Sequence, residues 1–118
     1  MSLSHMLLSG IFVLGGADAF LKPGPRVSKV ENAGVPQPEQ AVVLNGAAMV
    51  IGGTALALDI APKPAALMLI GVLIPTTIVG HAFWNETDAS ARKMQQTQFL
   101  KNLGLIGGLL LVLLEKNK

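Results

Sequence analysis

The chain of 118 residues has no cysteine, few aromatic residues (4%) and few charged residues (14%). Without thiols, it cannot form disulfides, thioether-linked haem or cysteine-ligated iron–sulfur clusters on its own. Soluble domains carry about 25% charged residues. The low charge content and a mean hydropathy of +0.55 therefore indicate a membrane protein of one domain. A net charge of +2 is too small to predict nucleic-acid binding.

Long apolar runs are what the chain has instead. They cover residues 3–21, 41–58, 64–84 and 99–114. About 20 helical residues cross the hydrocarbon of a bilayer, and an unclosed sheet cannot do so. Apolar and polar residues do not alternate within these runs, which excludes a β-barrel. The sequence thus predicts an all-α membrane protein, an antiparallel bundle of four transmembrane helices forming a single domain over residues 1–118.

The segments between the runs refine this prediction. Residues 22–40 contain several prolines and glycines, which bracket a short surface helix over 26–32. A tight turn is expected at 59–63. The fourth run is short, and we expect its helix to extend back through 91–96, because those residues are good helix formers.

Positive charge favours one orientation. An even number of spans puts both termini on one side. The first and third connections hold more lysine and arginine than the opposite side, which predicts that they lie in the cytoplasm and the termini outside. The residues compared are Lys22, Arg26, Lys29, Arg92, Lys93 and the boundary residue Lys101 against Lys63, Lys116 and Lys118.

Threading the four spans brings most of the unusual polar residues to one membrane face. A charged side chain in hydrocarbon costs about 3 kcal/mol or more unless it is paired or hydrated. We therefore expect the polar groups to turn inward, toward one another, as a candidate ligand site. Its members are Asp18, Asn45, His81, Trp84, Lys101 and Asn102. The opposite face has His5, the 59–63 turn and the chain end from Glu115.

Five of the six candidates also have an ordinary structural interpretation. Asp18 would pair with Lys22, Asn45 would form an interhelical hydrogen bond, His81 would bond Asp18 or a backbone carbonyl, Trp84 would anchor at the interface, and Lys101 would snorkel. A metal needs three or four ligands, and a lone histidine does not supply them. No metal site and no catalytic residue is predicted.

Small residues on the spans predict close helix packing, within the bundle or against a partner. The strongest group is Gly104, Gly107 and Gly108 in the fourth span. Pro75 removes one backbone hydrogen bond from the third span and is expected to kink it, with Thr76 or Thr77 covering the freed carbonyl.

Three segments together resemble the DoxX family. They are His-Ala-Phe-Trp at 81–84, Phe-Leu-Lys-Asn-Leu-Gly-Leu-Ile-Gly-Gly at 99–108 and Gly-Gly-Ala-Asp-Ala at 15–19. The resemblance implies a four-helix protein of the bacterial plasma membrane with a link to respiratory or redox chemistry. Some relatives carry a carboxylate in the second span where this chain has Asn45, which puts a proton-relay role at that position in doubt.

Two functions follow as expectations. The first is an accessory or scaffold subunit of a bacterial respiratory or redox assembly, without catalysis of its own, whose partners are other integral membrane proteins. The alternative is binding of a quinone or another small lipophilic ligand at the polar cluster, at most as a subunit of a quinone-linked oxidoreductase. A transporter or channel is disfavoured, because polar residues on one side only do not line a continuous path.

Overall fold

The computed structural model describes residues 3–81 and 83–115, and all regular structure within them is helical, which confirms the predicted fold class. The elements are α1 (Leu3–Leu21), α2 (Gly24–Asn32), α3 (Pro38–Ala57), α4 (Pro62–Pro75), the π-helical η1 (Thr76–Gly80), the 3-10 helical η2 (Phe83–Asn85) and α5 (Ala89–Leu114). By length and composition, four spans can cross a membrane: α1, α3, the run Pro62–Asn85 and α5.

The helix bounds follow the sequence prediction, with extensions of the second, third and fourth spans. The third runs over Pro62–Asn85 instead of 64–84. α1 has the predicted bounds, and α3 begins at Pro38 instead of residue 41. α5 begins at Ala89, where the Asp88 side chain caps the helix by accepting the Ala91 N–H at 2.9 Å. Growth of the fourth helix back into the polar segment is thus confirmed, and so is the short helix of the first connection, α2.

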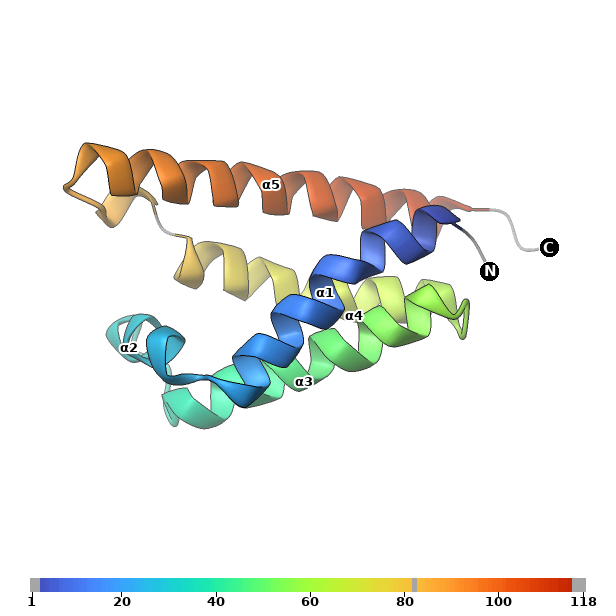
Figure 1. Cartoon of the computed structure of the whole chain (residues 1–118), viewed down its shortest axis with the longest axis horizontal. Helices are drawn as coiled ribbons and strands as arrows, with labels where there is room; N and C mark the ends of the chain where they lie inside the picture. Colours follow the sequence, from blue (N-terminus) through green and yellow to red (C-terminus); the bar gives the residue numbers. More distant parts are fainter. Residues whose placement is uncertain (1–2, 82, 116–118) are drawn as a thin grey trace.

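The four spans run up and down in an uneven bundle (Figure 1). α1 begins and α5 ends at one end of the bundle, while α2 and the start of α5 lie at the other. α1 packs along α3, and α4 packs against both α3 and α5. α1 approaches α5 at the end where α1 begins and diverges from it toward α2. Lys116 and Lys118, which entered the charge comparison, lie outside the described residues.

The closest helix contact joins α1 and α3 at two buried glycines. A Cβ added to Gly16 would stand 2.7 Å from the carbonyl oxygen of Gly46 and 2.8 Å from Met49 Cβ. A Cβ added to Gly46 would stand 2.7 Å from the oxygen of Gly16 and 2.9 Å from the Phe20 nitrogen. Backbone meets backbone here, so only hydrogen fits at both positions.

The packed core fills one half of the bundle. Its fully buried members include Phe12, Leu56, Leu69 and Leu109. The cluster is completed by Ala65, Ala66, Leu73 and Val112. Most of these positions lie near the end of α3, the start of α4 or the end of α5, which is the end of the bundle away from α2. The half nearer α2 is packed less fully.

The third span changes its helical form at Pro75, the residue at which the sequence predicted a kink. α4 ends there and continues as the π-helical η1. The Thr76 hydroxyl donates to the Val72 carbonyl at 2.7 Å, and the Thr77 hydroxyl donates to the Leu73 carbonyl at 2.6 Å. These two hydroxyls cover carbonyls next to the break, where the regular helical ladder is disturbed.

Candidate functional site

A cavity of about 640 Å³ lies in the half of the bundle nearer α2, between α1, α2, α3, η1 and α5. Its volume falls within the range of about 300–1,000 Å³ that is usual for small-molecule sites. Five of the six predicted polar residues line this one cavity: Asp18, Asn45, His81, Lys101 and Asn102. Helices far apart in the sequence thus bring them together.

The deeper wall of the cavity is apolar. Phe12, Met49, Leu73 and Leu105 line it, and each lies well inside its membrane span. The charged residues of the lining come instead from the end of α1, from α2 and from the first half of α5. The cavity therefore has a polar end and an apolar body.

Two asparagines join the spans across the cavity wall. Asn45 Nδ2 donates to Thr76 Oγ1 at 2.8 Å, which connects α3 to η1. Asn102 is buried, and its Nδ2 donates to Thr77 Oγ1 at 3.0 Å, which connects α5 to η1. Each amide nitrogen carries a second N–H. That of Asn45 also contacts the Met49 sulfur at 3.7 Å, a weak acceptor.

Asp18 joins α1 to α2. Its Oδ2 accepts from Arg26 Nη1 at 2.9 Å, and both side chains are about half exposed. The sequence analysis expected the side chain of Asp18 to pair with Lys22, but its partner is Arg26. Lys22 contacts this residue through its backbone, whose N–H donates to the Asp18 carbonyl. The ion pair holds the short α2 over the polar end of the cavity.

The other two polar groups are oriented by glutamines of α5. His81 Nδ1 and Gln95 Oε1 are 2.7 Å apart, so the ring is held by α5 and not by Asp18 or a backbone carbonyl. Lys101 Nζ donates to Gln98 Oε1 at 2.5 Å, one helical turn earlier. Both contacts are with a neutral amide.

Trp84 does not line this cavity. Its ring makes edge-on contacts with Phe83 and Phe99, with centroids 5.3 and 5.8 Å away, and the two phenylalanines are 5.4 Å apart. Trp84 lines a smaller hollow of about 260 Å³ together with Lys29 and Asn32 of α2. The aromatic contacts fasten η2 to α5.

The glycines of α5 are not tightly packed within the chain. A Cβ added to Gly104 or Gly107 would meet nothing within 4 Å, and one added to Gly108 would meet the tip of the Leu8 side chain at 3.4 Å. Their predicted contact with a partner helix stays a prediction.

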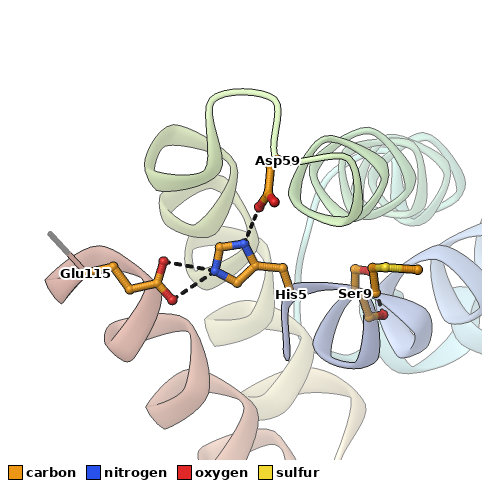
Figure 2. Close-up of polar contacts among 5 residues, drawn as sticks. His5, Ser9, Asp59 and Glu115 are labelled. Atoms are coloured by element: carbon orange, nitrogen blue, oxygen red, sulfur yellow. Dashed lines mark hydrogen bonds and ion pairs between the residues drawn. The ribbon is translucent and has the colours of Figure 1, made fainter. Parts of the chain in front are cut away.

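A second polar cluster closes the opposite end of the bundle (Figure 2). His5 is 4% exposed and lies between two carboxylates. Its Nδ1 is 2.5 Å from Asp59 Oδ1, and its Nε2 is 2.9 and 3.0 Å from the two carboxylate oxygens of Glu115. An imidazolium ring, which donates from both nitrogens, satisfies both carboxylates at once.

The turn after α3 presents Asp59 to this histidine. The N–H of Ile60 donates to the Ala55 carbonyl at 2.8 Å and the N–H of Asp59 to the Leu56 carbonyl at 3.1 Å. This is the Schellman pattern, with Asp59 in the left-handed region at φ 55°. The sequence prediction gave His5 no role, although the threading placed it at the same face as the two acids.

Among residues 3–81 and 83–115, no three His, Asp or Glu side chains are arranged to hold a metal ion. The sequence model of the DoxX family matches residues 3–82, which ends before α5. No curated protein and no solved structure matches the chain.

Proposed function

Since this chain belongs to the DoxX family and has four helices able to span a membrane, we propose that it binds a small lipophilic ligand with a polar head. The ligand occupies the 640 Å³ cavity in the bacterial plasma membrane, with α2 on the cytoplasmic side. The observation that carries the proposal is the convergence of five polar side chains on one cavity with an apolar body.

A quinone is one ligand class that fits this lining. Its carbonyl oxygens accept hydrogen bonds, and donors stand on the wall at Asn45, Asn102 and Lys101. Its apolar tail would lie against Phe12 and Leu105. When bound, a quinone would supply two-electron redox chemistry, and this chain would hold and orient it. A site with few polar groups in an apolar pocket is typical of cofactor binding.

Filling the cavity should abolish binding. Gly15 lines the cavity, and a Cβ added there meets nothing within 4 Å, so a large side chain can enter without displacing the backbone. Gly15→Phe is expected to weaken the binding of a short-chain ubiquinone by more than about tenfold, because its ring occupies the ligand's space. Titration of the purified protein in nanodiscs measures this.

The matched control is Gly10→Phe. Gly10 lies on the same helix, has equally open space around an added Cβ, and is not part of the cavity wall. The control should bind ubiquinone as the natural chain does. Equal affinities for Gly15→Phe and the natural chain would contradict the proposed site.

An accessory role in a respiratory or redox assembly is the second candidate. It is favoured by the open α5 face at Gly104 and Gly107, where nothing in the described chain approaches an added Cβ within 4 Å. Glycines on an uncovered membrane helix suit close approach by another helix. On this proposal the ligand is shared with a redox partner, and the chain itself carries out no reaction.

Co-purification tests this second candidate. Gentle extraction from bacterial plasma membranes should recover the chain with a subunit that carries a redox cofactor, identified by mass spectrometry. Gly104→Leu/Gly107→Leu should reduce that recovery several-fold, because the added side chains hold the partner away, while ubiquinone binding is unchanged. A chain that elutes alone from both detergent and nanodiscs would argue against an accessory role.

A further inference from the structure

The charges around the cavity define its ligand more closely. We propose that the ligand is a single-chain amphiphile with an anionic head, a carboxylate or phosphate, held at the polar end while its chain lies in the apolar body. This inference rests on the proposed function, because it names the ligand class of the same cavity.

The cavity wall is rich in cations. Arg26 and Lys29 of α2 and Lys101 of α5 line it, whereas Asp18 is the single acidic residue among the described residues of the lining. Asp18 is already paired with Arg26 at 2.9 Å. Lys101 is held by the neutral amide of Gln98 and has no acidic partner among the contacts of the described residues. The lining thus carries more positive than negative charge, which an anionic head would balance.

The position of these cations fits a ligand that enters from the bilayer. Lys29 is in α2, at one end of the bundle (Figure 1), and Lys101 is at the middle of α5, where it lines the same cavity. Beside hydrocarbon, an ammonium group gains more from an anion than it does in water, because the local dielectric constant is lower. A neutral head would leave that attraction unused.

The size of the cavity indicates one chain. A volume of 640 Å³ lies in the middle of the range for ligands of drug size. The apolar wall extends from the polar end only to Ile11 and Leu73, near the middle of their spans, and the packed core with Leu56 and Leu69 closes the space beyond. A head and a short apolar chain match this shape.

Four probes and three variants test the inference, together with ubiquinone and Gly15→Phe from the test of the proposed function, all in phosphatidylcholine nanodiscs. The probes are laurate, lauryl phosphate, lauryl alcohol and inorganic phosphate. Lys101→Gln should weaken the binding of laurate or lauryl phosphate by about tenfold. Lys101→Arg should retain this binding. Arg92→Gln is the matched control, because Arg92 lies on the same helix, is exposed and is not part of the cavity wall. Whichever of laurate and lauryl phosphate binds more tightly shows whether the head group is a carboxylate or a phosphate.

The results separate this inference from the proposed function. Lauryl alcohol binding as tightly as both anionic probes, or equal losses in Lys101→Gln and Arg92→Gln, would overturn the anionic head. Inorganic phosphate binding as tightly as lauryl phosphate would overturn the amphiphile. In either case, ubiquinone binding that is blocked by Gly15→Phe would leave the cavity as the ligand site. Laurate binding that persists in Gly15→Phe would place the anion elsewhere and overturn the inference.

Discussion

Gly16→Ala or Gly46→Ala is expected to lower the free energy of unfolding by about 2 kcal/mol, although alanine is the better helix former. The added methyl group would stand 2.7 Å from a backbone oxygen of the opposite helix in either variant. Neither backbone can rotate away as a flexible side chain would. α1 and α3 must therefore separate along their whole contact, which weakens the most extensive helix interface of the bundle.

Unfolding in mixed dodecyl maltoside and dodecyl sulfate micelles, followed by circular dichroism, measures this effect. Gly15→Ala is the control, because it makes the same chemical change one residue away, where an added Cβ meets nothing within 4 Å. It should be neutral or stabilising, since alanine in a helix is favoured over glycine by about 1 kcal/mol.

The effects of the two substitutions on stability should not be additive. Gly16→Ala/Gly46→Ala should cost less than the sum of the two single changes, because both methyl groups enter one gap that the first has already opened. Equal stabilities of Gly16→Ala and Gly15→Ala would mean that α1 and α3 do not cross at this point.

His5→Leu is expected to lower the free energy of unfolding by about 2 kcal/mol. The change leaves the Asp59 and Glu115 carboxylates facing a buried apolar side chain with the imidazole removed. Fully buried pairs cost about 3–5 kcal/mol when one partner is lost. The smaller value reflects carboxylates that remain 30% and 46% exposed and regain some hydration.

Neutralising the two carboxylates in addition should restore most of the stability that His5→Leu loses. His5→Leu/Asp59→Asn/Glu115→Gln is expected to come within about 1 kcal/mol of the natural chain, because the two carboxylates that the imidazole contacts are then neutral amides. Asparagine also tolerates the left-handed conformation at position 59. The same micelle unfolding assay measures both variants.

Ser9→Ala is the control for this end of the bundle. Ser9 is buried one turn after His5, and its hydroxyl donates to the Met6 carbonyl of the same helix at 2.9 Å. Its loss should cost less than about 1 kcal/mol. A triple variant no more stable than His5→Leu would show that the imidazole contributes packing and not charge.

The two ends of the bundle contrast in their packing. At one end, His5 joins α1 to α5 and to the turn after α3, directly above the filled core. At the other end, α1 diverges from α5 (Figure 1), and amides, an ion pair and α2 surround the cavity instead. The half that holds the core is tightly packed, and the other half holds the cavity.

Much of the site was predictable, because it depends on topology alone. Four spans that alternate in direction must bring the end of the first and third to the start of the second and fourth. Asp18, Asn45, His81, Lys101 and Asn102 share a membrane face for that reason, and the structure places them on one cavity. The cavity itself could not be predicted, since it depends on how far α1 and α5 diverge.

The partners of these residues were not predictable from spacing. Asp18 has charged neighbours at Lys22 and Arg26, and only the path of the chain into α2 brings Arg26 to it. The ring of His81 could reach several acceptors. It contacts Gln95 because α5 begins at Ala89, which places Gln95 on a helix beside the ring.

The sequence by itself determined the helical class, the number of spans and the face at which polar groups gather, because bilayer thickness and backbone hydrogen bonding leave no other choice. Only the tertiary structure decided which face of each helix points inward. α3 and α4 are apolar on all sides, so their lipid-facing and core-facing residues look alike in the sequence. Close contact at Gly16 and Gly46 fixes the rotation of α1 and α3, and the His5 cluster fixes α1 against α5.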